Sequence, residues 1–342
     1  MIKEAIAQVV AGENLGEKEM EGVMEEIMTG QATAAQIGAF LTALHLKGET
    51  VEEITGAARM LRAKALRIRV NKREILLDTC GTGGGLSTFN VSTATAFVAA
   101  GAGVRVAKHG NRAVSSRAGS ADVLESLGFN LHLSTGEVER SIREIGIGFL
   151  FAPLFHGAME QVASSRREIG IHTIFNLLGP LTNPAGASAQ VLGVYDPALT
   201  EKLARVLERL GTREAFVVCG EGPYDEISIC GPTHIAHLKD KRVRTFDFSP
   251  EEVGFQRARP ESIQGGDAAE NARIIRAILD GEPGPRREMV LLNAAAAFMI
   301  VGLDRTFPEG AKRGAATIDS GRAREKLEQL IAFSQQWNKS HA

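Results

Sequence analysis

The stretch from Ile75 to Ser120 constrains the fold most, because two short apolar runs in it each end in a loop of unusual composition. The first run, Ile75–Leu77, is followed by four glycines among the five residues 81–85. Glycine accepts positive φ and carries no side chain, so such a loop lets bare backbone N–H groups approach an anion closely. Asn90–Thr93 then precede a run of good helix formers, and a helix N-terminus also favours negative charge.

The second apolar run, Val104–Val106, leads into a loop with three cations and two serines but no acid: Lys108, Arg112, Ser115, Ser116 and Arg117. A single glycine-rich turn is more often structural than functional. Two such loops after two strands, one of them basic, favour a site for a ligand with several phosphates. The first loop is not a dinucleotide fingerprint, because Leu86 stands where the last glycine is required, and it is not a Walker A loop, because no G-K-[ST] follows.

The chain divides by pattern into two predicted domains. Residues 1–66 predict a small α-helical domain, in which the capping boxes Thr33–Gln36 and Thr50–Glu53 mark helix starts. Residues 67–342 alternate short aliphatic runs with helical patterns, which is typical of an α/β domain with a central, mostly parallel sheet. We expect strands near 75–78, 104–107, 148–151, 190–195, 215–219 and 227–230. We expect helices near 92–100, 120–127, 137–145, 200–210, 268–279, 289–302 and 320–337.

The segment near 155–185 breaks this alternation. Its first part reads as a helix, and Gly179-Pro180 and Asn183-Pro184 follow as a turn region. We expect the segment to return to the helical domain, which would place it across a cleft from the two loops.

Charge and cysteine content exclude several classes of protein. The formal net charge is -2, so the chain has no general attraction to nucleic acid or to an anionic membrane. Three cysteines without C-x-x-C spacing argue against a disulfide framework or a zinc site and suit a reducing compartment. The N-terminus does not read as a signal peptide, and the apolar run Met289–Leu303, interrupted by Asn293, is too short for a membrane span. We therefore expect a cytoplasmic protein.

Two further groups of residues could carry chemistry. Asp225 and Glu226 follow an expected strand, and Mg²⁺ takes one or two protein carboxylates and completes its shell with water and substrate phosphates. By itself such an acid pair is more often solvated surface. Arg166 could hold a planar carboxylate with two parallel hydrogen bonds, although an exposed Arg-Arg pair with Glu168 is the simpler interpretation. His109 and His156 are single histidines, which are more often structural than catalytic.

The motifs GTGG at 81–84, NVST at 90–93 and KHGNRAVSS at 108–116, in this order and spacing, resemble those of the anthranilate phosphoribosyltransferase family. The resemblance implies a helical domain and an α/β domain with a cleft between them, the fold shared with nucleoside phosphorylases. It implies transfer of a 5-phosphoribosyl group from 5-phosphoribosyl 1-pyrophosphate (PRPP) to the amine of anthranilate, with Mg²⁺ as cofactor, in tryptophan biosynthesis. It also implies a homodimer that meets through the helical domain.

The resemblance assigns roles residue by residue. Lys108, Asp225 and Glu226 would be catalytic, and the magnesium ligands would be Ser92, Asp225 and Glu226. Anthranilate would contact Gly81, Asn111 and Arg166, with His109 and His156 nearby. PRPP would contact Gly81, Gly84, Thr88, Asn90, Val91, Ser92, Thr93, Lys108, His109, Gly110, Asn111, Arg112, Ala113, Val114, Ser115, Ser116 and Ser120.

The chain departs from the family pattern at three places. The usual G-T-G-G-D-G lacks its Asp here and appears one residue shorter, Gly157 replaces the usual Pro of H-P-A-M, and His172 replaces the frequent Arg of G-I-R-T. The missing Asp puts one acidic PRPP or metal contact in doubt. Two other functions remain open: a nucleoside phosphorylase on the same fold, and a non-catalytic relative that binds nucleic acid. The acid pair favours PRPP over the first, and the net charge of -2 disfavours the second.

Overall fold

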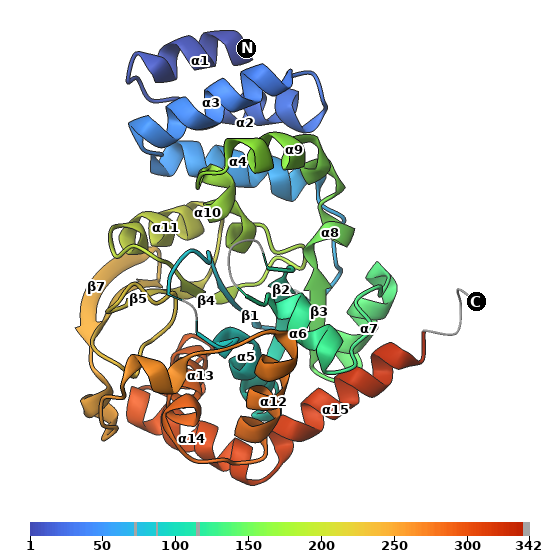
Figure 1. The fold of residues 1–342 in the computed structure, drawn as a ribbon, viewed down its shortest axis with the longest axis vertical. Coiled ribbons are helices and arrows are strands. Elements are labelled where there is room, and N and C mark those ends of the chain that lie inside the picture. The colour runs from blue at the N-terminus through green and yellow to red at the C-terminus, as the bar shows by residue number, and fades with distance from the viewer. Residues whose placement is uncertain (72–73, 87, 114–116, 338–342) are drawn as a thin grey trace.

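The structure is a computed structural model that describes residues 1–71, 74–86, 88–113 and 117–337. A bundle of helices forms one end of the molecule, and a sheet with helices on both faces forms the rest (Figure 1). The bundle begins with α1 (Ile2–Val10), α2 (Glu17–Met28), α3 (Ala34–Lys47) and α4 (Val51–Lys64). Both predicted capping boxes are present at the starts of α3 and α4.

Seven strands in the described part of the chain form one sheet in the order β3-β2-β1-β4-β5-β6-β7. Their bounds are β1 Leu76–Gly81, β2 Arg105–Gly110, β3 Ile147–Phe151, β4 Ala189–Gly193, β5 Glu214–Gly220, β6 Thr233–Lys239 and β7 Arg242–Phe248. The pairs among β3, β2, β1, β4 and β5 are parallel, and β6 and β7 are antiparallel to their neighbours. The predicted mostly parallel sheet is confirmed, and the carboxyl ends of its parallel strands lie along one edge.

Each face of the sheet contributes to a separate apolar core. Phe216 and Val218 of β5 belong to the core formed with α5 (Val91–Gly101), α12 (Ala268–Leu279), α13 (Pro285–Ile300), α14 (Phe307–Asp319) and α15 (Arg322–Gln335). Val217 and Cys219 belong to the other core, which includes α11 (Ala198–Arg209) and the helical bundle. This alternation is what a strand buried on both faces produces. α6 (Ser120–Ser126) and α7 (Thr135–Glu144) lie between β2 and β3 in sequence.

The segment between β3 and β4 packs on the bundle. It contains α8 (Ala152–Phe155), α9 (Glu160–Ile169) and α10 (Ile174–Leu181). α9 contacts α3 and α2, and α10 contacts α4 and α3. Figure 1 shows α9 and α10 at the end of the molecule formed by the bundle. Val162 of α9 and Phe175 of α10 share an apolar core with Phe40 of α3. The expected turn at Gly179-Pro180 is wrong, because both residues lie inside α10. Pro180 falls in the last turn of the helix, where its missing N–H costs a single helical bond.

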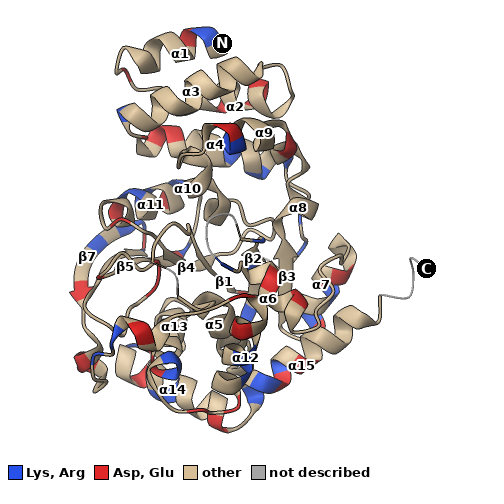
Figure 2. Ribbon diagram, viewed as in Figure 1, with Lys and Arg blue, Asp and Glu red and all other residues tan. Residues whose placement is uncertain are grey.

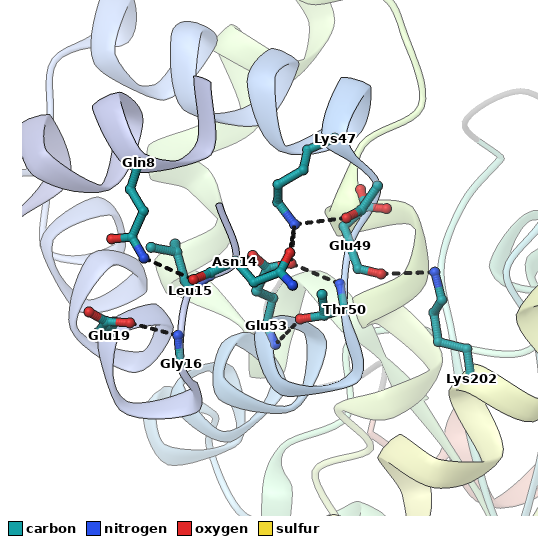
Figure 3. Close-up of polar contacts among 11 residues, drawn as sticks. Gln8, Asn14, Leu15, Gly16, Glu19, Lys47, Glu49, Thr50, Glu53 and Lys202 are labelled. Atoms are coloured by element: carbon teal, nitrogen blue, oxygen red, sulfur yellow. Dashed lines mark hydrogen bonds and ion pairs between the residues drawn. The ribbon is translucent and has the colours of Figure 1, made fainter. Parts of the chain in front are cut away.

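Glu53, at the start of α4, joins three segments of the bundle (Figure 3). Its carboxylate accepts hydrogen bonds from the backbone N–H groups of Leu15 at 2.9 Å and Thr50 at 2.8 Å, and from Lys47 Nζ at 3.0 Å. Because Glu53 is fully buried, each of these donors also replaces water around a charge that would otherwise be costly to bury. Lys202 of α11 donates to the carbonyl of Glu49 at 2.8 Å, so the same corner is tied to the sheet-covering helix.

Three other expectations about the C-terminal half differ from the structure. Residues 227–230 form a loop rather than a strand, and the hairpin of β6 and β7 was not expected. Its turn consists of Asp240 and Lys241 at φ 50 and 59, a conformation that Asn-Gly or Asp-Gly usually supplies, so the sequence lacks the common signal. The helix α14 was also missed, although the Thr306–Glu309 capping box marks its start.

The surface carries mixed charge. Lys and Arg are interspersed with Asp and Glu along α11, α14 and α15 (Figure 2), in keeping with the net charge of -2. Among the described residues, no helix is both long and apolar enough to cross a membrane.

Candidate functional site

A pocket of about 540 Å³ opens at the carboxyl ends of β1, β2 and β5 and reaches α9 and α10. Most of the residues that the sequence predicts for the site line it: Gly81, Gly84, Thr88, Asn90, Val91, Ser92, Lys108, His109, Gly110, Asn111, Arg112, Ala113, Ser120, His156, Arg166, Asp225 and Glu226. Thr93 is buried in α5 and does not line the pocket. Val114, Ser115 and Ser116 lie outside the described residues. The two loops and the acid pair therefore face one space.

The glycine-rich loop after β1 folds over the turn that carries the acids. Gly83 and Gly84 have φ of +64 and +89, which side chains rarely adopt. Gly81 allows close packing, because a Cβ there would lie 2.4 Å from Asp225 Oδ2. The backbone N–H of Gly83 donates to the same Oδ2 at 3.0 Å, and that of Leu86 donates to the Pro223 carbonyl at 3.2 Å. The loop thus needs glycine both for its backbone angles and for its contact with Asp225.

Lys108 is buried at the end of β2 and points toward β1 and α5. Its Nζ donates to the Thr79 carbonyl at 2.7 Å and to Ser92 Oγ at 3.1 Å, while Thr79 Oγ1 donates to the Ser92 carbonyl. Burial lowers the pKa of Lys108, and the nearby charge of Asp78 opposes that shift. These bonds place one cation beside the N-terminus of α5, where an anion is also favoured by the helix dipole.

Asp225 and Glu226 are desolvated, and burial raises the pKa of both carboxyl groups. Glu226 Oε1 accepts from Thr88 Oγ1 at 3.0 Å, while its Oε2 is buried without a hydrogen-bond partner. A buried carboxylate oxygen without a hydrogen-bond donor is costly, and a bound cation would remove that cost. In the described part of the chain no three His, Cys, Asp or Glu residues gather to hold a metal. The two adjacent carboxylates of Asp225 and Glu226 fit an ion such as Mg²⁺, which takes one or two protein carboxylates and completes its shell with water and substrate oxygens.

Arg112 lines the pocket but is already paired. Its guanidinium forms ion pairs with Glu125 at 2.8 Å and Asp122 at 2.9 Å, and these bonds hold its pKa above the usual value. Asp122 also accepts from the backbone N–H groups of Ala113 and Gly119, so it ties the two ends of the second loop together. In this arrangement Arg112 supports the loop.

The opposite wall of the pocket carries Arg166 and two histidines. The Arg166 guanidinium lies 5.2 Å from the centre of the Phe175 ring, it has no acidic partner among the described residues, and burial lowers its pKa. The rings of His109 and His156 are 5.1 Å apart. Burial lowers the pKa of His109 to about 3 and that of His156 to about 4, so both are neutral at pH 7. Their Nε2 atoms are buried without a partner.

Sequence reasoning missed a set of buried amides behind the site. Asn183 donates to Asp78 Oδ2 and to the Ala107 carbonyl, both at 2.8 Å, and so ties β1 to β2. Asn293 accepts from the Ile227 N–H and donates to the Ile227 carbonyl, directly after Glu226. Asn293 had a signal, since it interrupts an otherwise apolar run, and a polar residue there must find buried partners. Asn183 sits in an Asn-Pro sequence that is typical of any turn.

His172, one of the three departures from the family pattern, also supports the glycine-rich loop. A Cβ on Gly84 would lie 2.5 Å from His172 Cε1, so the ring lies against the bare Cα. The His172 ring in turn packs against the Tyr195 ring in a T-shaped arrangement, with 5.3 Å between the ring centres. Two of the departures from the family pattern, the glycine-rich loop without its Asp and His172 in place of Arg, therefore lie next to each other in the structure.

Fold and pocket together define a glycosyltransferase with a helical bundle and an α/β domain. Residues 3–65 match the helical bundle domain of a glycosyl transferase family, and residues 73–324 match its α/β domain. The anthranilate phosphoribosyltransferases of Syntrophobacter fumaroxidans and Symbiobacterium thermophilum are 54% and 56% identical to the chain. These matches cover 98% and 97% of this chain and 99% and 98% of the relatives.

Solved structures agree. The anthranilate phosphoribosyltransferase of Thermus thermophilus matches with a TM-score of 0.91 and 45% identity over 97% of this chain and 99% of that one. The Saccharomyces cerevisiae enzyme in complex with PRPP and Mg matches with a TM-score of 0.91 and 28% identity over 98% of each chain. The chain belongs to the anthranilate phosphoribosyltransferase family and is an enzyme of the glycosyltransferase class. The resemblance and the fold class predicted from the sequence are both confirmed.

Proposed function

We propose that the chain transfers the 5-phosphoribosyl group of PRPP to the amine of anthranilate, releasing pyrophosphate, in tryptophan biosynthesis. One observation carries the proposal: two anion-binding loops, a buried acid pair and an arginine without an acidic partner among the described residues line the same pocket. Similar proteins support it, because yeast anthranilate phosphoribosyltransferase is described in complex with PRPP and Mg and with 4-fluoroanthranilate.

PRPP would lie along the two loops that follow β1 and β2. The glycine-rich loop and the start of α5 offer backbone N–H groups, and Lys108 offers the buried cation between them. The roles that the resemblance assigns to the remaining residues stay proposals. Thr93 would act only through its backbone at the start of α5, because its side chain is buried away from the pocket.

Mg²⁺ would be held by Asp225, Glu226 and Ser92, together with PRPP oxygens and water. When bound, the ion would neutralise charge on the departing pyrophosphate. The unpartnered Glu226 Oε2 supports this choice of ligand, and the Oγ of Ser92 accepts a hydrogen bond from Lys108. Ser92 has a second lone pair that remains able to accept a cation.

The displacement at ribose C1 would be dissociative, with an oxocarbenium-like sugar. Negative charge grows on pyrophosphate as it leaves, and Lys108 and the loop N–H groups stabilise that charge without having to move. The aromatic amine of anthranilate is neutral at pH 7, so no strong general base is required, and we assign none. The neutral histidines on the far wall accord with this, since protonated imidazoles would repel an incoming cationic sugar carbon.

Anthranilate would bind between the phosphate loops and α9. Arg166 would pair with its carboxylate, because a guanidinium presents two parallel donors. Gly81, Asn111, His109 and His156 complete the surroundings of this subsite, and all of them line the pocket.

Assembly and location are proposals as well. We assign residues 1–66 and the segment near 155–185 to a helical domain and the rest of the chain to an α/β domain, and we propose a homodimer through the helical domain. Exposed apolar side chains on α1 and α3 support that surface, with Val10 69% and Leu46 81% exposed. Free cysteines, Cys80, Cys219 and Cys230, suit a cytoplasmic location.

Loss of anthranilate fluorescence tests the function directly. The signal should fall only when the chain, PRPP and Mg²⁺ are all present, and omitting any one should leave it constant. A constant signal in the complete mixture, together with phosphate-dependent cleavage of a pyrimidine nucleoside, would replace the transferase with a nucleoside phosphorylase on the same fold.

A further inference from the structure

Asn271, in α12, is joined to the PRPP loops by a chain of three hydrogen bonds. The backbone N–H of Gly266 donates to Asn271 Oδ1 at 2.8 Å, and Asn271 Nδ2 donates to Asn90 Oδ1 at 2.9 Å. Asn90 Nδ2 then donates to the Ala118 carbonyl at 3.1 Å. Asn90 lines the pocket, whereas Asn271 is 2% exposed and does not.

The order of donors along this chain fixes which way each amide points. A backbone N–H can only donate, so the atom of Asn271 that faces Gly266 must be the carbonyl oxygen. Its NH₂ group is then the end that faces Asn90, and Asn90 must answer with its own oxygen. The NH₂ group of Asn90 is left to face the carbonyl of Ala118, a residue that also lines the pocket. One of its hydrogens is donated to that carbonyl, and the other has no acceptor among the described residues.

Gly265, in the loop before α12, packs closely against both Asn271 and the end of the glycine-rich loop. A Cβ on Gly265 would lie 2.7 Å from Asn271 Oδ1, 2.7 Å from the Thr88 carbonyl and 2.8 Å from Phe89 Cα. Hydrogen bonding selects the orientation of the Asn271 amide. A flipped amide would set its NH₂ group against the N–H of Gly266 and its oxygen against Asn90 Oδ1.

We propose that Asn271 is a positioning residue for PRPP, which locks the amide of Asn90 so that a hydrogen-bond donor faces the phosphate site. The inference rests on the proposed function in taking PRPP as the ligand. It adds a residue outside the pocket, 181 positions from Asn90 in the sequence, which acts on the ligand through the orientation of the Asn90 amide. Asn271 touches no substrate, so it is not a catalytic residue.

Asn271→Asp tests polarity rather than size. The substituted side chain keeps the acceptor for Gly266 and has nearly the same shape, but at high pH it presents an oxygen to Asn90 Oδ1. Burial and the negative charge of Asp267, one helical turn away, both raise the pKa of the introduced carboxyl above its ordinary value. Below that pKa the neutral acid donates its O–H to Asn90 and restores the chain of bonds. The Kd for PRPP, relative to wild type at the same pH, should therefore rise on the order of tenfold from pH 5.5 to pH 8.5.

Asn130→Asp is the matched control. Asn130 also accepts from a backbone N–H, that of His132 at 3.0 Å, but it does not line the pocket. Its relative Kd for PRPP should stay constant with pH. Should Asn271→Asp fail to fold, Asn271→Ala should raise the KM for PRPP about fivefold at every pH and leave that for anthranilate unchanged.

Calorimetry with PRPP and Mg²⁺, without anthranilate, separates this inference from the proposed function. If wild-type chain binds PRPP but consumes no anthranilate, the transfer reaction is wrong, and a pH-dependent Kd ratio for Asn271→Asp would still support the positioning role. If wild-type chain transfers the group while Asn271→Asp shows a Kd ratio independent of pH, the positioning role is overturned. Equal rises of both KM values in Asn271→Ala would overturn it too, since they indicate a general loss of structure.

Discussion

The carboxylate of Asp225 accepts a hydrogen bond from the backbone N–H of Gly83, with 3.0 Å between Oδ2 and the nitrogen. This bond joins the turn after β5 to the glycine-rich loop after β1, which are 142 residues apart in the sequence. The same N–H is a donor that a phosphate would use, and the same oxygen is one that a cation would use. In the free chain each group thus satisfies the other, and binding of PRPP with Mg²⁺ would exchange this bond for two stronger contacts.

The acid pair can be neutralised without unfolding the chain. Asp225→Asn with Glu226→Gln should abolish Mg²⁺-dependent turnover and keep or raise the melting temperature. Because burial raises the pKa of both carboxyl groups in the folded state, ionising them above their unfolded pKa destabilises the fold at neutral pH, and amides remove that cost. Calorimetric melting without Mg²⁺ and the fluorescence assay measure the two effects. Glu221→Gln, which changes an exposed acid in the same turn, should do neither.

The contact between Gly84 and His172 can be isolated by a pair of glycine variants. Gly83→Ala and Gly84→Ala both strain a positive φ, but only the second places a Cβ against His172, whereas nothing lies within 4 Å of a Cβ on Gly83. We expect Gly84→Ala to raise the KM for PRPP several-fold more than Gly83→Ala does. Gly84→Ala with His172→Ala should return it to the level of Gly83→Ala. Equal KM values for the two single variants would show that His172 does not shape the loop.

Most of the residues that the sequence predicts for the site line the pocket, because they lie in a few local segments. Gly81–Gly85 and Lys108–Ala113 lie at the carboxyl ends of β1 and β2, Asn90–Thr93 begin the helix between these strands, and parallel strands bring their carboxyl ends to one edge. What the sequence could not predict depends on packing between distant segments. Whether Arg112 faces the ligand or pairs with Glu125, and whether Asn271 meets Asn90, follow from the docking of α6 and α12, which no local pattern encodes.

The same distinction explains the errors in the fold. The apolar run at 227–230 resembles a strand in composition, but Asn293 of α13 satisfies both backbone groups of Ile227 and so replaces a strand partner. The hairpin of β6 and β7 turns at Asp240 and Lys241, which adopt positive φ without glycine. In the first case a tertiary contact outweighs the local preference, and in the second the pairing of β6 with β7 does.

Arg166 and its neighbour Arg167 provide a test and its control on one helix. Arg166→Ala should raise the KM for anthranilate about 100-fold and change that for PRPP less than threefold. The reason is that a buried ion pair between a guanidinium and a substrate carboxylate contributes on the order of 3 kcal/mol to binding. Arg167 is exposed and does not line the pocket, so Arg167→Ala should change neither KM. Steady-state kinetics with each substrate varied separately measure this. Equal rises in both KM values would exclude Arg166 as the carboxylate partner.

The buried histidines should make the chain sensitive to acid. His109 and His156 have pKa values of about 3 and about 4 in the folded chain, below the ordinary 6.5. The unfolded chain therefore binds more protons, and stability is fully present above pH 6.5 and falls as the pH drops toward 4. The loss is on the order of 3 kcal/mol for each histidine by pH 4, or about 6 kcal/mol for the pair. Melting temperatures of wild type and of His109→Gln with His156→Gln should converge as the pH falls, whereas His45→Gln, at an exposed site, should follow wild type at every pH.

Association through the helical domain can be tested at one exposed leucine. The Leu46 side chain on α3 is 81% exposed. An apolar side chain of that size would be removed from water if the α3 surface contacts a second copy of the chain. Leu46→Asp would bury a charge at each copy of a symmetric contact, so the dimer Kd should rise at least about tenfold. Leu303→Asp, at a 42% exposed position beyond α13, should leave it unchanged. Sedimentation equilibrium at micromolar concentration measures the dimer Kd of both variants. If only Leu303→Asp weakens the dimer, the interface lies on the α/β domain and the proposal is wrong.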